Sequence, residues 1–160
     1  MIARVLNTIF ILLFVCVSLI SAPLEAHELP ALSNGQIVYV PAYSHIYIGG
    51  KKRPFELAIT LSIRNIDLKG EIRLKEVHYF GSQGNLIESF IDDTQSVRPQ
   101  ESVRFVIGEK DKGGGSGANF IVKWESAAKV NPPIIESIMI GGQASQGISF
   151  TSRGRPIIID

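Results

Sequence analysis

Three tyrosines and a histidine fall on one face of an early segment if that segment is extended. Tyr39, Tyr43, His45 and Tyr47 all occupy odd positions, and alternate residues of a strand point to the same side. Phenol and imidazole rings in such a row can stack on sugars or contact a partner protein. The same pattern is also typical of aromatic residues that pack a β-sandwich and leave their hydroxyls at its rim, so both interpretations stay open.

Polar residues elsewhere in the chain extend this binding hypothesis. Arg153 and Arg155 can bind an anion through their planar guanidinium groups, although solvated or paired arginines are the ordinary alternative. We expect a binding site if the fold brings five residues to one concave surface. These residues are Tyr43, His45, Arg64, Asn119 and Arg153.

The histidines support an alternative of a different class. If the fold brings His45 and His78 together with Glu76 or Asp92, they can hold a metal ion or take part in acid–base chemistry. The chain has neither an HExxH nor an H-x-H motif, and its third histidine, His27, lies near the N-terminus. A metal-binding protein or metal-dependent enzyme is therefore the alternative function.

Two stretches imitate cofactor or metal motifs. Residues 113–118 fit the letters G-x-G-x-x-A, but a predicted strand follows them, where a dinucleotide site needs a helix. Asn65, Asp67 and Glu76 have the spacing of a calcium loop, but Lys69 occupies a ligand position. We interpret the first stretch as a flexible hairpin tip and the second as a hairpin turn, and we predict no cofactor and no catalytic residue.

Charge and cysteine content restrict the chemistry further. Sixteen Lys and Arg residues against fifteen Asp and Glu residues give a net charge of +1, which favours neither nucleic acid nor anionic lipid as a partner. Cys16 is the only cysteine and lies in the N-terminal apolar segment. Removal of that segment would leave no disulfide, no zinc knuckle and no cysteine nucleophile.

Alternation of apolar and polar residues predicts an all-β fold. Residues 55–64 alternate strictly, and a phase slip after Leu74 indicates a β-bulge at residues 75–76. Only residues 125–130 have a weak helical pattern. Strand-like runs at intervals of 8–12 residues predict an immunoglobulin- or fibronectin-like antiparallel β-sandwich of about seven to nine strands.

The N-terminus has the layout of a secretory signal. Arg4 precedes an uncharged apolar run at residues 9–20, and Ala26 offers a small residue for cleavage. The apolar run is shorter than the ~20 residues that a membrane-spanning helix needs. We therefore divide the chain into a signal peptide at 1–26, a linker at 27–35 and one β-sandwich domain at 36–160. An exported protein of the periplasm or cell envelope is expected, with tethering by an uncleaved signal as the alternative.

Several segments together resemble the family called domain of unknown function 3124. The segments are Gln36-Ile-Val-Tyr-Val-Pro-Ala-Tyr-Ser-His-Ile-Tyr, Arg53-Pro-Phe, Leu61-Ser-Ile-Arg-Asn, Gly117-Ala-Asn-Phe, Glu136-Ser-Ile-Met-Ile-Gly and Gly147-Ile-Ser-Phe-Thr-Ser-Arg-Gly-Arg. The resemblance covers nearly all of the chain after the signal and implies a small exported bacterial protein of the Gram-negative envelope. It brings no assigned reaction, cofactor or catalytic residue. Some family members resemble lipoproteins, but Cys16 lacks a lipobox, so lipidation is not implied here.

These observations favour a non-enzymatic interaction module that binds an envelope protein or a glycan. The metal-dependent function through His45 and His78 is the second hypothesis. A purely structural or stress-related envelope protein is the third.

The signal-peptide interpretation predicts that the mature protein begins at His27. Mass spectrometry of the intact protein from the envelope fraction should give the mass of residues 27–160. Replacement of Ala26 by Phe should block this cut, because the cleavage site requires small residues. A mature protein that retains residues 1–26, or that begins at Pro23, would contradict the prediction.

Overall fold

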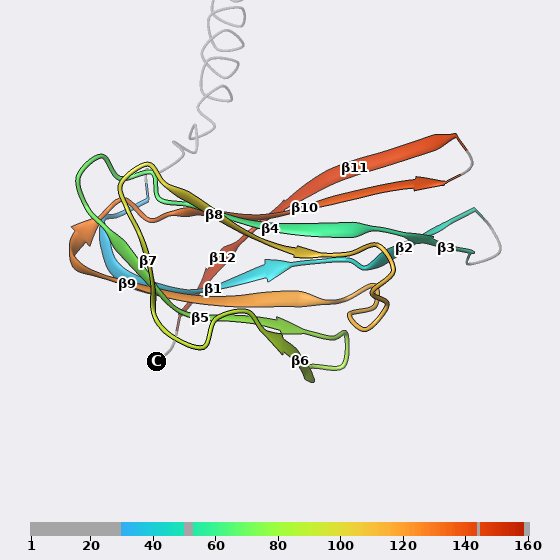
Figure 1. Ribbon diagram of the computed structural model, residues 1–160, viewed down its shortest axis with the longest axis horizontal. Helices are drawn as coiled ribbons and strands as arrows, with labels where there is room; N and C mark the ends of the chain where they lie inside the picture. Colours follow the sequence, from blue (N-terminus) through green and yellow to red (C-terminus); the bar gives the residue numbers. More distant parts are fainter. Residues whose placement is uncertain (1–29, 50–52, 144, 159–160) are drawn as a thin grey trace, which may run out of the picture.

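The computed structural model describes residues 30–49, 53–143 and 145–158, and within these residues the chain forms antiparallel β-sheets and no helix (Figure 1). The strands are β1 (Ser33–Pro41), β2 (His45–Ile48), β3 (Arg53–Glu56), β4 (Ala58–Arg64), β5 (Ile72–Phe80), β6 (Leu86–Ser89), β7 (Gln95–Val97), β8 (Ser102–Ile107), β9 (Asn119–Val130), β10 (Ile134–Gln143), β11 (Gln146–Arg153) and β12 (Arg155–Ile157). The predicted all-β sandwich is confirmed, with more strands than expected. The predicted signal peptide lies outside the described residues.

Two sheets form the layers of the sandwich. The six-stranded sheet has the order β12-β1-β9-β5-β6, with β7 also paired to β5, and the four-stranded sheet has the order β11-β10-β4-β8. The short β2–β3 ladder lies at one end, beside the β10–β11 hairpin (Figure 1). Because neighbouring strands in sequence often lie in different sheets, the chain crosses between layers several times.

The core lies between the inner faces of the two sheets. Ile59, Leu61 and Ile63 alternate along β4 and are fully buried, as the strict alternation of residues 55–64 predicts. Phe120 and Trp124 of β9 are buried in the other sheet and belong to the same core. The described residues contain no cysteine, so burial of this apolar surface is the main source of stability.

The local predictions have mixed outcomes. The register of β5 against β9 shifts between Leu74 and Glu76, which confirms the predicted bulge. Residues 125–130, in contrast, continue β9 instead of forming a helical turn. Glu125 pairs with Gly35 of β1 and Val130 pairs with Ser33, with a register shift between the two pairs, and this pairing at both ends overrides a weak local helical preference.

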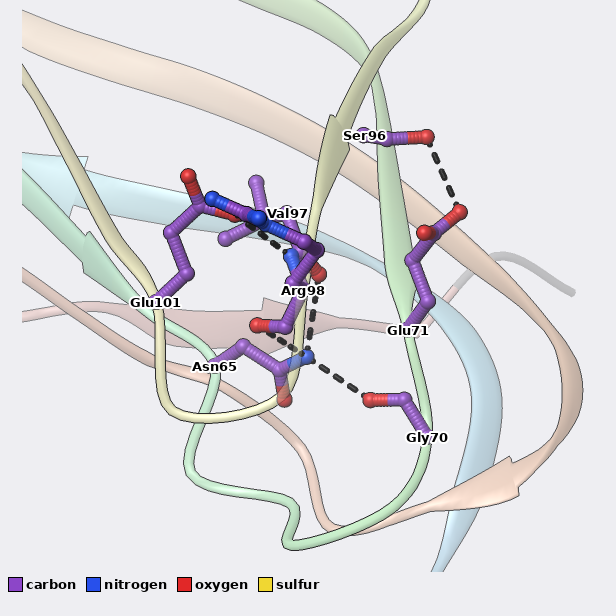
Figure 2. Close-up of polar contacts among 7 residues, drawn as sticks. All are labelled: Asn65, Gly70, Glu71, Ser96, Val97, Arg98 and Glu101. Atoms are coloured by element: carbon purple, nitrogen blue, oxygen red, sulfur yellow. Dashed lines mark hydrogen bonds and ion pairs between the residues drawn. The ribbon is translucent and has the colours of Figure 1, made fainter.

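The segment between β4 and β5 crosses from one sheet to the other and is not the predicted hairpin turn. Asn65, only 2% exposed, follows β4 directly. The two N–H groups of its Nδ2 are shared among three backbone oxygens, those of Gly70 at 2.8 Å, Val97 at 3.1 Å and Arg98 at 3.1 Å (Figure 2). Val97 ends β7, from which the chain crosses back to β8, so one buried amide joins two crossings between the layers.

Asp67 adds a third crossing to this junction. Its Oδ1 accepts hydrogen bonds from the backbone N–H groups of Lys69 and Gly70 at 2.9 and 2.8 Å. Its Oδ2 accepts the backbone N–H and Nδ2 of Asn131, at 2.9 and 3.0 Å, where the chain leaves β9 for β10. Gly70 is required here, since a Cβ on it would lie 2.2 Å from Cγ1 of Val130. We call Asn65 and Asp67, with these partners, the crossover junction.

Replacement of Asn65 by Ala should lower the free energy of unfolding by about 2–4 kcal/mol, because the Gly70, Val97 and Arg98 carbonyls lose a buried donor. Asn65→Asp should lower the free energy of unfolding at least as much, since a carboxylate oxygen would replace the donor and face the three carbonyl oxygens. Urea denaturation measures both effects. The matched control is Asn34→Ala, whose exposed amide makes a single 3.5 Å hydrogen bond to Ser126 and should cost less than about 0.5 kcal/mol. A loss below about 1 kcal/mol for Asn65→Ala would contradict the role of the junction.

The junction also predicts acid sensitivity. Hydrogen bonds from the N–H groups of Asn131, Gly70 and Lys69 hold the pKa of Asp67 well below its ordinary value of 3.8. Because the folded pKa is the lower one, the stabilisation is complete above that ordinary value and is lost as the pH falls toward the folded pKa.

Asp67→Asn should therefore be less stable than the wild type near neutral pH, and its stability should decline less steeply between about pH 5 and pH 2. Urea titrations across this range measure the slope. Asp93→Asn, at an exposed position between β6 and β7, should keep the wild-type slope. Equal slopes for Asp67→Asn and the wild type would rule out this role for Asp67.

Candidate functional site

The structure distributes the five predicted site residues over separate surfaces. Tyr43 and His45 lie at the end of the sandwich formed by the β2–β3 ladder. Arg64 is the last residue of β4 and lies at the opposite end of the sandwich. Arg153, the last residue of β11, lies near it, because β4 and β11 both pair with the same segment of β10. Asn119 begins β9 and alternates with the buried Phe120, so it faces outward from the six-stranded sheet. The five residues therefore do not form one concave surface.

The predicted tyrosine row is interrupted between β1 and β2. Tyr39 lies on the outer face of the six-stranded sheet, opposite Arg155 of β12 and Ile121 of β9. Tyr43, beyond the end of β1, is half-buried, and its ring centroid lies 5.8 Å from that of Phe150 in β11. Tyr43 thus packs against β11, as expected if the aromatic residues of the row pack the sandwich instead of binding a ligand.

His45 and Tyr47 remain together on one face of β2. Their rings meet edge to face with centroids 5.2 Å apart, and Tyr47 is 57% exposed. In the β2–β3 ladder His45 lies opposite Glu56, and Tyr47 lies opposite Pro54. These four residues, with Ser44 and Lys112, line a hollow of about 200 Å³, which we call the β2 hollow.

The loop between β8 and β9 forms one wall of the β2 hollow. Lys112 makes an ion pair with Glu56 of β3, with 2.5 Å between Nζ and Oε1. Both the backbone N–H and the hydroxyl of Ser44 donate to the Gly115 carbonyl, at 3.0 and 3.1 Å. The hydroxyl of Ser82 donates to the Gly114 carbonyl at 2.8 Å. Hydrogen bonds on both sides hold the loop that the sequence predicted to be a flexible hairpin tip.

The glycines of this loop allow its close packing. A Cβ on Gly114 would lie 1.8 Å from the phenolic oxygen of Tyr79, and one on Gly115 would lie 2.5 Å from Oγ of Ser82. Gly115 also has a φ of +78°, which side chains disfavour. Burial, with a smaller contribution from the Asp111 charge, raises the pKa of Tyr79 to about 12. The sequence did not predict that this loop lines the β2 hollow, because its hydrogen-bond partners, Ser44 and Ser82, lie far away in the sequence.

The second group of predicted residues lies on the outer face of the four-stranded sheet. Arg153, Glu136, Ser62 and Arg104 lie opposite one another on successive strands β11, β10, β4 and β8. Arg64 lies beside this row, with an ion pair of 3.7 Å to Glu136. Gly154 separates Arg153 from Arg155, because the chain crosses there into the other sheet.

The two histidines of the metal hypothesis lie on different elements. His78 faces outward from β5, where its ring packs edge to face against Phe80 at 6.2 Å and its Nδ1 lies 3.9 Å from Glu76. His45 belongs to the separate β2–β3 ladder. Within residues 30–49, 53–143 and 145–158 no three His, Cys, Asp or Glu side chains form a metal-binding group. His27 lies outside these ranges.

Comparison with known proteins gives a family and no activity. Residues 35–157 match the family model described as "Protein of unknown function (DUF3124)". No curated protein matches the sequence. The crystal structure of Thermotoga maritima 1070 is similar over 75% of this chain and 92% of its own, with 12% sequence identity and a TM-score of 0.42. In the part of the chain that the structure describes, no helix is long and apolar enough to span a membrane.

Proposed function

The chain belongs to the DUF3124 family of proteins of unknown function, and we propose that it is a non-enzymatic binding module whose β2 hollow binds a glycan. The proposal rests on one observation, the exposed Tyr47 ring beside His45, Glu56 and Lys112 in a hollow of about 200 Å³. An exposed aromatic face can stack on the C–H face of a sugar, while the charged groups bind its hydroxyls.

Several contacts support the shape of the β2 hollow before a ligand binds. The Lys112–Glu56 ion pair joins the β8–β9 loop to β3, and the two hydrogen bonds from Ser44 join the same loop to the start of β2. His45 packs edge to face against the Tyr47 ring and restricts its orientation. A site built in advance loses less conformational entropy when it binds, so weak individual contacts become effective.

The proposed setting is the bacterial cell envelope. It is supported by the signal-like layout of residues 1–26, which is typical of a segment that directs the chain after it out of the cytoplasm. The near-neutral net charge of +1 also agrees with a ligand that is not recognised mainly by charge at the β2 hollow. An envelope protein as partner is the competing outcome of the following test.

Titration calorimetry of the mature protein with a panel of neutral oligosaccharides tests the proposal. We expect at least one to bind, and Tyr47→Ala to weaken binding about tenfold because the stacking surface is lost. His45→Ala should weaken it less. Tyr39→Ala is the matched control. This partly exposed tyrosine lies on the six-stranded sheet, away from the β2 hollow, so its replacement should leave the affinity unchanged.

Two results would overturn the proposal. One is an absence of binding to every oligosaccharide by protein whose thermal unfolding shows it to be folded. The other is saccharide binding that Tyr47→Ala and His45→Ala leave unchanged, which would place the ligand elsewhere on the molecule. Co-purification of an envelope protein that depends on Tyr47, without saccharide binding, would favour the protein partner instead.

A further inference from the structure

The outer face of the four-stranded sheet has a charge distribution unlike that of the whole chain. Four charged residues face outward from its strands: Arg64, Arg104, Glu136 and Arg153. Three arginines and one glutamate give this face a charge of +2, whereas the whole chain carries +1. All four residues lie toward the end of the sheet that adjoins the crossover junction, so the positive charge is concentrated there.

The arginines of this face are unequally neutralised. Arg64 is engaged, since its Nε donates to the Ser62 hydroxyl at 3.2 Å and its guanidinium lies 3.7 Å from Glu136. For Arg104 and Arg153, the described part of the chain provides no carboxylate within 4.0 Å. Arg104 and Arg153 therefore retain donors for an external anion, and Arg64 retains those of its five N–H groups that Ser62 and Glu136 do not engage.

A hollow of about 240 Å³ lies between Arg64 and Arg104. Its other lining residues are Thr60, Ser62, Ser102, Val103 and Ile138. Because Arg64 lies opposite Ser102 and Arg104 lies opposite Ser62, the two arginines are diagonal neighbours on adjacent strands, a spacing of about 7–8 Å that long side chains can bridge. An oxyanion between them can accept hydrogen bonds from both and reduce their mutual repulsion.

The hollow also offers groups that suit a polyol. Three hydroxyls, from Thr60, Ser62 and Ser102, lie beside the arginines, and Ile138 supplies apolar surface. Its volume lies just below the range of about 300–1,000 Å³ that is common for small-molecule sites, which suits a single sugar ring. We propose that this hollow, the β4–β8 hollow, binds an anionic saccharide through the carboxylate, sulfate or phosphate group that the sugar carries.

The crossover junction fixes the end of the β4–β8 hollow. Asn65, directly after Arg64, donates its backbone N–H to the Glu101 carbonyl at 3.0 Å, and Ser102 follows Glu101. Glu101 in turn accepts the backbone N–H of Arg98 at 2.8 Å and its Nε at 3.2 Å (Figure 2). The ends of β4 and β8 are thereby joined, so Arg64 and Arg104 project from a supported pair of strands.

Calorimetry of the mature protein with oligogalacturonate tests the proposal, with its methyl ester as the neutral counterpart. We expect the acidic oligomer to bind at least about tenfold more tightly than the ester, and more weakly as NaCl rises from about 50 to 300 mM. A sulfated oligosaccharide and a sugar phosphate are further probes of the oxyanion, and inorganic phosphate alone tests whether the sugar contributes.

Arg104→Gln should weaken binding about fivefold or more, and Arg104→Lys less, since lysine keeps the charge and loses the planar pair of donors. Arg155→Gln is the matched control, because Arg155 is an exposed arginine of the six-stranded sheet, and this change should leave the affinity unaltered. Tyr47→Ala should also have no effect, so failure of this proposal is distinguishable from failure of the β2 hollow. Because Arg104 is exposed, unchanged thermal unfolding should show that the variant is folded.

Three outcomes of the experiments with saccharides and vesicles would overturn the proposal. They are no binding of any anionic saccharide, equal binding by the wild type and Arg104→Gln, and binding to vesicles of anionic phospholipid without binding to any saccharide. The last outcome would identify a membrane surface as the ligand. Binding of inorganic phosphate as tight as that of the sugar phosphate would likewise remove the saccharide from the proposal.

Discussion

The buried amide of Asn65 is the interaction on which the arrangement of the two sheets most depends. A β-sandwich needs its chain to leave one layer and enter the other, and the backbone groups at those crossings lose their ladder partners. Here the carbonyls of Gly70, Val97 and Arg98 converge on one side-chain nitrogen, and Asp67 binds the N–H groups of the neighbouring crossing at Asn131. Two polar residues, Asn65 and Asp67, therefore satisfy crossings that lie more than sixty positions apart in the sequence.

The two ends of the sandwich are built by different physical means. At the junction end, polar side chains bind backbone groups of several loops. At the β2–β3 end, the absence of side chains matters more, since Gly114 lies against Tyr79, and a Cβ on Gly141 would lie 2.3 Å from the Glu56 carbonyl. The β4–β8 hollow adjoins the first end and the β2 hollow adjoins the second. Each proposed ligand surface is thus supported by the contacts that close the fold nearby.

The strands and their inner faces were largely predictable, because the alternation of residues 55–64 reports burial on one side directly. The bulge after Leu74 was predictable for the same reason, since a change of phase is visible in the sequence. Partners in space were not predictable. The segment 65–70 has the composition of a hairpin turn, yet it joins two sheets, and residues 125–130 take their strand conformation from β1. Local preferences of a few tenths of a kcal/mol per residue yield to such pairing.

The sequence by itself determined the all-β class, the buried side of regularly alternating strands such as β4 and the family to which the chain belongs, because these depend on local periodicity and composition. Only the tertiary structure decided which polar residues act together. It separated Tyr39 from Tyr43 and Arg153 from Arg155, and it placed Lys112 beside Glu56 and Arg104 beside Arg64. The reason is physical: strand pairing and sheet crossings set these neighbours, and both join residues whose distance along the chain carries no local signal.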